Sequence, residues 1–162
     1  MTNRTGTILM FAALALLSTG CVRVDKVSSL DKRFIKAREQ TKGVVHKAFD
    51  DVNARRERLK GFKNTVPDHD RAVWEEMKVL TEKMASLGKE MSTFPGRIEI
   101  LRNQLKLVVG KRTKVRSDEP RLWQQVEDIK GKLEGLFKEF KGLTGHYTDL
   151  NRTFRTLSGQ LR

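Results

Sequence analysis

The sequence has little of several residue types that often define a fold or a site. Its 162 residues include one cysteine, one tyrosine, three prolines and three histidines. A single cysteine excludes a disulfide framework within the chain. The few prolines leave long stretches without helix breakers. With 33% charged and 38% hydrophobic residues, this composition suits a long helical or coiled-coil protein better than a compact globule.

Patterns that carry catalysis or metal binding are also missing. The three histidines, His46, His69 and His146, lie in different parts of the chain. The sequence holds no HExxH, no paired spacing of metal ligands and no glycine-rich phosphate-binding loop. We therefore predict a protein that is not an enzyme and has no catalytic residue, metal or cofactor.

The N-terminus contains the only long apolar run. Arg4 and the amino terminus supply a short positive segment, Ile8–Leu17 are apolar, and small residues follow at Ser18–Gly20. This order is typical of a secretory signal peptide. The run is well short of the ~20 residues that a spanning helix needs. We therefore predict a cleaved signal peptide over residues 1–20.

The residues around the single cysteine resemble the lipobox of bacterial lipoproteins; they are Leu17, Ser18, Thr19, Gly20 and Cys21. The resemblance implies that the Cys21 thiol receives a diacylglycerol, that cleavage occurs before Cys21, and that the new amino group is acylated. Ser18 departs from the commonest pattern, which has leucine three places before the cysteine. An ordinary signal peptidase site is therefore the alternative.

The same resemblance gives an expectation for localisation. Aspartate directly after the cysteine tends to retain enteric lipoproteins at the inner membrane, whereas this chain has Val22. We predict a lipid-anchored protein of the bacterial cell envelope, on the periplasmic side of the outer membrane if the host is Gram-negative.

From Ser29 onward, apolar residues recur every three or four positions in three segments. This is the heptad spacing of helices with one apolar stripe each, and no segment shows the period of two that a strand needs. The stripes comprise Leu30, Phe34, Ala37, Thr41, Val45, Ala48, Val52, Arg55, Leu59 and Phe62; then Val73, Met77, Leu80, Met84, Leu87, Met91, Phe94, Ile98, Leu101, Leu105 and Val108; then Leu122, Val126, Ile129, Leu133, Leu136, Phe140, Leu143, Tyr147, Leu150, Phe154, Leu157 and Leu161.

Two short breaks that contain proline, Asn64–Asp68 and Ser117–Pro120, separate the segments. Short connections place neighbouring helices antiparallel. The predicted fold is all-α, an elongated antiparallel three-helix bundle or coiled coil over residues 29–162. A lipid-attached tether over residues 21–28 precedes it, and the helices are expected near 29–64, 68–115 and 119–161. A hairpin that completes its core by oligomerising is the structural alternative.

Pro95-Gly96 interrupts the second segment. Proline inside a helix removes a hydrogen bond and clashes with the preceding turn. The heptad phase nevertheless continues from Phe94 to Ile98, which favours one kinked helix over two separate helices.

The formal net charge of +13 predicts basic clusters at both ends of such a bundle. A basic collar beside the membrane would comprise Lys32, Arg33, Lys36, Lys111, Arg112, Lys114 and Arg116, with Lys26 and Arg38 nearby. A second cluster at the opposite end would comprise Arg55, Arg56, Arg58, Lys60 and Lys63, joined by the C-terminal Arg152, Arg155 and Arg162. The alternative for each cluster is an ordinary solvated helix flank paired with glutamate.

These features favour a non-catalytic envelope lipoprotein whose helices act as a spacer or protein-binding module. Its expected partners are the membrane, through the lipid, and a protein partner or a second copy of the chain. The first alternative is a binder of an anionic envelope ligand, such as peptidoglycan, lipopolysaccharide or an acidic polymer. The second is a phage-type lysis lipoprotein. The basic charge alone suggests nucleic acid, but the export signal and the lack of a recognition motif argue against it.

Overall fold

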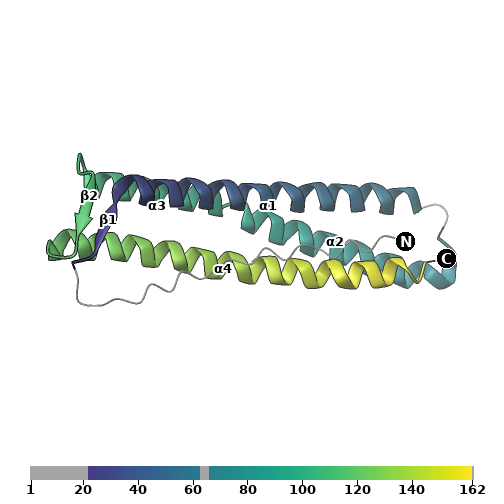
Figure 1. Ribbon diagram of the computed structural model, residues 1–162. Coiled ribbons are helices and arrows are strands. Elements are labelled where there is room, and N and C mark those ends of the chain that lie inside the picture. Colours follow the sequence, from purple (N-terminus) through teal and green to yellow (C-terminus); the bar gives the residue numbers. More distant parts are fainter. Residues whose placement is uncertain (1–21, 63–65, 162) are drawn as a thin grey trace, which may run out of the picture.

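The structure is a computed structural model that describes residues 22–62 and 66–161 (Figure 1). These residues form a mostly helical fold, as predicted, with two short strands that were not predicted. The elements, in chain order, are β1 (Val24–Lys26), α1 (Val27–Phe62), the short 3-10 helix η1 (Asp68–Asp70), α2 (Arg71–Met91), α3 (Phe94–Val109), β2 (Lys114–Arg116) and α4 (Pro120–Ser158). The predicted signal peptide, the lipidation site Cys21 and the cluster residue Lys63 lie outside the described residues.

The helices lie side by side along one long axis (Figure 1). The strands β1 and β2 lie at one end, which we call the strand end. From there α1 leads away, α2 and α3 return, and α4 leads away again to the far end. Both α2 and α3 pack against α1 and against α4, so the middle of the chain joins its first and last helices.

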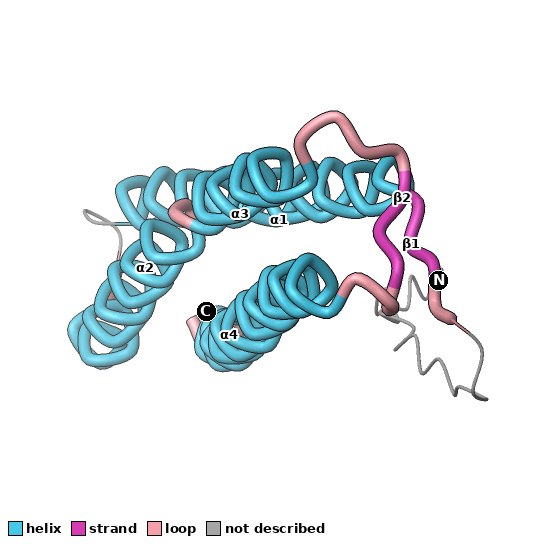
Figure 2. Tube along the Cα trace, turned by 90° about the vertical axis from the view of Figure 1, so that its left-hand side faces the viewer, coloured by secondary structure: helices cyan, strands magenta, loops and turns pink. Residues whose placement is uncertain are grey.

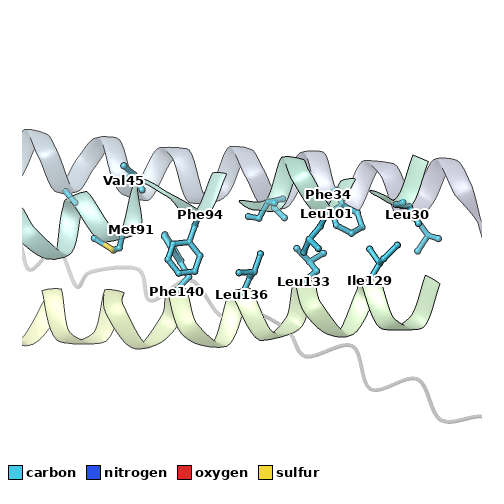
Figure 3. Close-up of a cluster of buried hydrophobic side chains, with 14 of the residues drawn as sticks. Leu30, Phe34, Val45, Met91, Phe94, Leu101, Ile129, Leu133, Leu136 and Phe140 are labelled. Carbon is cyan, nitrogen blue, oxygen red and sulfur yellow. The ribbon is translucent and has the colours of Figure 1, made fainter. Parts of the chain in front are cut away.

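The core is built from the apolar stripes of all the helices. Figure 3 shows Phe34 of α1 beside Leu101 of α3 and facing Leu133 of α4, and Leu30 of α1 facing Ile129 of α4. Phe94 and Phe140 meet edge to face, with their ring centroids 5.1 Å apart. A smaller cluster continues the core at the far end; its buried members are Leu59, Met77, Leu80 and Phe154. Each stripe is narrow, so each helix depends on the others to keep its apolar side chains from water.

Two positions in the stripe of α1 are polar, and the heptad spacing nevertheless turns both side chains toward the core. Thr41 is only 2% exposed, and its hydroxyl donates to the carbonyl oxygens of Ala37 and Arg38 at 3.1 and 2.9 Å. Arg55 is half-buried, and its guanidinium carbon lies 4.4 Å from the ring centroid of Phe154. The Thr41 hydroxyl is thus satisfied by its own helix, whereas Arg55 donates to Asn151 of α4 at 2.6 Å.

The interruption near Pro95 differs in position from the predicted kink at Pro95-Gly96. It falls at Ser92 and Thr93, between α2 and α3. Here the Thr93 N–H donates to the carbonyl oxygen of Glu90, one residue closer than in an α-helix, at 3.2 Å. The break precedes the proline because Pro95 has no N–H with which to continue the ladder. Ser92 and Thr93 keep right-handed helical backbone angles, so α3 continues roughly along α2 (Figure 1).

The structure corrects the predicted end of the second helix at residue 115. α3 ends at Val109, and Gly110 follows with a φ of 55°, a left-handed angle that favours glycine. The chain then turns and forms β2. The predicted tether over residues 21–28 also differs from the structure, because Val24–Lys26 pair with β2 and α1 begins at Val27.

The single tyrosine links α4 to α1 inside the core. The Tyr147 hydroxyl donates to the carbonyl oxygen of Ala48 at 2.9 Å, and the residue is 7% exposed. Burial, helped by the nearby negative charge of Asp51, raises the pKa of Tyr147 from 10.0 to about 12. The folded protein therefore holds this proton more tightly than the unfolded chain does.

The tyrosine titration tests this packing. Because the folded pKa is the higher one, the stability linked to Tyr147 is fully present below pH 10 and is lost as the pH rises from 10 towards 12. The absorbance change of tyrosinate in the folded protein should have its midpoint near 12. In concentrated guanidinium chloride the midpoint should fall to about 10. The same midpoint in both conditions would show that Tyr147 is not buried.

Candidate functional site

The pairing of β1 with β2 fixes the start of the described chain to the connection between α3 and α4 (Figure 2). The strands are antiparallel, and the register pairs Val24 with Arg116, Asp25 with Val115, and Lys26 with Lys114. Backbone hydrogen bonds extend the pairing on both sides. The Val27 N–H donates to the Thr113 carbonyl oxygen, and the Ser117 N–H donates to that of Arg23, both at 3.0 Å.

One face of this strand pair is tied to the bundle. Val115 is fully buried in the core. Lys130 of α4 donates to the carboxylates of Asp25 and Glu127 at 2.7 and 2.6 Å. Burial lowers the pKa of Lys130, but its hydrogen bonds to Asp25 and Glu127 outweigh burial and leave the pKa above its ordinary value. β1 is therefore held both by the backbone of β2 and by an ion pair to α4.

The other face of the strand pair is exposed and basic. Side chains alternate along a strand, so Lys26, Lys114 and Arg116 point away from Val115. Lys26 lies directly opposite Lys114, an arrangement of like charges that destabilises a sheet unless an anion offsets it. Arg116 donates to both carboxylate oxygens of Asp118 at 2.9 and 2.7 Å, whereas neither lysine has a carboxylate partner among the described residues.

The structure places the predicted basic collar at this strand end. Lys111 and Arg112 are exposed in the turn after α3, and Lys32, Arg33 and Lys36 are exposed in the first turns of α1. None of these five pairs with a carboxylate in residues 22–62 and 66–161. Arg38, slightly further along α1, is paired, with Glu39 at 3.0 Å and Glu99 at 3.3 Å. Within the described residues, Arg116 is therefore the one member of the collar that an ion pair compensates.

The second predicted cluster divides into two groups in the structure. Arg56 forms a bidentate ion pair with Glu82 of α2, at 3.0 and 2.8 Å, which raises the pKa of Arg56 and lowers the pKa of Glu82. Lys60 pairs with Glu57 at 2.7 Å on the same helix. Arg55 and Arg58 have no carboxylate partner in the described part of the chain. Of these residues, Arg55 and Arg58 therefore keep their charge available to an anion outside the protein.

Arginines in the middle of the bundle form ion pairs that join neighbouring helices. Arg97 donates to both oxygens of Glu139 at 2.7 and 2.8 Å, which joins α3 to α4. Arg102 donates to both oxygens of Asp31 at 2.6 and 3.0 Å, which joins α3 to α1 and lowers the pKa of that carboxyl. The contrast with the ends is clear, since there several arginines lack carboxylate partners within the described ranges.

Comparisons with known proteins give no relative from which to infer a function. No family model, no curated protein and no solved structure matches the chain. Within the described residues, no group of three or more histidine, cysteine, aspartate or glutamate side chains could hold a metal ion. No described helix combines the length and hydropathy that a membrane crossing requires. The two basic ends are the features that the structure offers for a function.

Sequence reasoning missed the residues that assemble the strand end, namely Asp25, Val115 and Lys130. The alternation of charged and apolar residues in Lys114-Val115-Arg116 was the one available signal, and three residues are too few to distinguish a strand from a turn.

The collar should bind anionic membranes. The lipid-free chain of residues 22–162 should bind vesicles containing anionic lipid at low salt and be released at high salt, because charges are screened within ~8 Å at physiological ionic strength. Replacing Lys111, Arg112 and Lys114 together with glutamine should lower vesicle partitioning more than about tenfold at low salt, since each juxtamembrane cation adds ~1 kcal/mol.

The matched control neutralises three exposed lysines away from the ends that also lack carboxylate partners among the described residues: Lys47, Lys138 and Lys141. It makes the same change in net charge and should have little effect. Equal losses in the two triple variants would show general electrostatic attraction without an oriented collar.

Proposed function

We propose that this protein is a non-catalytic lipoprotein of the bacterial cell envelope whose helical bundle stands on the membrane by its strand end. Acylated Cys21 is the anchor. The basic collar lies next to the lipid headgroups, and the helices carry the far end outward as a spacer or protein-binding module. In a Gram-negative host the site of attachment is the periplasmic face of the outer membrane.

The observation that carries this proposal is the pairing of Val24–Lys26 with Lys114–Arg116. Two residues, Val22 and Arg23, lie between Cys21 and Val24, so the three steps from Cys21 to Val24 span at most ~11 Å when fully extended. An acylated Cys21 therefore keeps the strand pair close to the membrane surface. The exposed face of that strand pair carries Lys26 and Lys114, which suits an anionic surface.

The length of the helices supports the role of a spacer. α1 has 36 residues and α4 has 39. At 1.5 Å per residue these helices are ~54 and ~58 Å long. We propose that they pack as an antiparallel three-stranded coiled coil in which α2 and α3 together form the middle strand. A bundle of this length places its far end well outside the headgroup region.

The second candidate function is binding of an anionic envelope ligand at the far end. It is favoured by one observation, the arginines there that have no carboxylate partner among the described residues. The two functions are compatible, because the anchor and the far end lie at opposite ends of the bundle (Figure 1).

Replacement of the anchor residue tests the proposal. Cys21→Ser should release the protein from the membrane fraction or leave it as an unprocessed precursor, because the hydroxyl cannot receive the thioether-linked lipid. Ser28→Ala, at an exposed position near the start of α1, should remain membrane-bound. Mass spectrometry of the membrane-extracted protein should show acyl chains on residue 21. Recovery of the wild-type chain without lipid and with a free thiol would contradict the proposal.

A further inference from the structure

Three arginines line one hollow at the far end of the bundle. Arg55 and Arg58 come from the last turns of α1, and Arg155 comes from the last turn of α4. The hollow has a volume of 430 Å³ and is open to solvent. Its remaining lining residues are Phe154, Ser158 and Gly159. The ends of α1 and α4 come together here because both helices run away from the strand end (Figure 1).

No carboxylate neutralises these three arginines within the described residues. Neighbouring arginines do find such partners: Arg152 of α4 pairs with Asp149 at 3.5 Å, and Arg56 of α1 pairs with Glu82 at 2.8 Å. The hollow is therefore a local concentration of positive charge in a region where other arginines are paired. Oxyanions are the ligands that guanidinium groups bind best, because two parallel N–H donors match two oxygens.

Arg55 is the preorganised member of the set. One of its terminal nitrogens, Nη2, donates to Oδ1 of Asn151 at 2.6 Å, and its guanidinium lies over the ring of Phe154 at 4.4 Å. Its Nε is buried and has no hydrogen-bond partner among the described residues. The contacts with Asn151 and Phe154 hold the guanidinium in one orientation, so less freedom is lost when an anion binds beside it.

The helix dipoles explain only part of this arrangement. Cations are favoured in the last turn of a helix, and both α1 and α4 end here. The final carbonyls of α4 are already satisfied in part, since the Gly159 N–H donates to the oxygens of Arg155 and Thr156 at 3.1 and 3.2 Å. A dipole accounts for a cation at each helix end, but it does not require three guanidinium groups around one hollow.

We propose that this hollow is a binding site for an oxyanion group, a phosphate or a carboxylate of an envelope ligand. Arg58 and Arg155 contact the anion from opposite helices, and Arg55 holds it against the aromatic edge of the core. This site rests on the second candidate function, binding of an anionic ligand at the far end, and gives it a place and a chemistry. It needs neither the lipid on Cys21 nor the collar, so its failure would leave the proposed anchoring untouched.

Calorimetric titration of the lipid-free chain, residues 22–162, tests the site with two probes, inorganic pyrophosphate and citrate, at low salt. The wild type should bind at least one of them, and the tighter probe distinguishes a phosphate site from a carboxylate site. Arg58→Gln and Arg155→Gln should each weaken binding about tenfold, the loss expected for one charge-assisted contact.

Arg152→Gln is the matched control, because it removes the same charge from the same helix end at an arginine that does not line the hollow. It should change affinity less than about twofold, since only long-range attraction is lost. Thermal melts should show that all three variants fold as the wild type does. Absence of binding by both probes, or an equal loss in Arg152→Gln and Arg155→Gln, would overturn the proposal.

Discussion

Each helix of this protein carries a single narrow apolar stripe that only the other helices can cover. This constraint determines the fold. The helices must run together along their length, so the bundle is long and has two chemically distinct ends (Figure 1). It also leaves most of every helix surface to charged residues, which is how a chain with a net charge of +13 can still fold around a continuous core.

The ion pairs of the arginines are unevenly distributed along the bundle. Along the middle of the bundle, arginines such as Arg97 and Arg102 are held by carboxylates of neighbouring helices, and they fix how the helices sit against each other. Such ion pairs contribute modestly to stability, and the charge of each arginine is not available to a binding partner outside the protein. Cations without a carboxylate partner among the described residues gather at the strand end and at the far end, although exposed lysines such as Lys47 and Lys138 also lack one elsewhere on the bundle. One end has a lysine pair on a strand next to the predicted anchor, and the other has an open hollow lined by arginines.

Much of the core could be predicted from the sequence, because burial follows the heptad spacing even where the residue is polar, as at Thr41 and Arg55. The strand pair could not. β1 and β2 are each three residues long and lie far apart in the sequence, so no local pattern identifies their pairing. The far-end arginines were recognised as a basic cluster. The sequence could not reveal that Arg56 pairs with Glu82 while Arg55 and Arg58 have no carboxylate partner among the described residues. That difference depends on how α1 and α2 are rotated about their own axes.

The proposed attachment through Cys21 is tested most directly by the orientation of the protein on a membrane. Single fluorophores can be attached through Thr113→Cys at the strand end or Gln160→Cys at the far end, both exposed positions, with the protein anchored in vesicles that carry a headgroup quencher. Our account predicts strong quenching at residue 113 and almost none at residue 160, because ~58 Å of helix separates the two ends. Equal quenching at both positions, or stronger quenching at residue 160, would contradict a bundle that stands on its strand end.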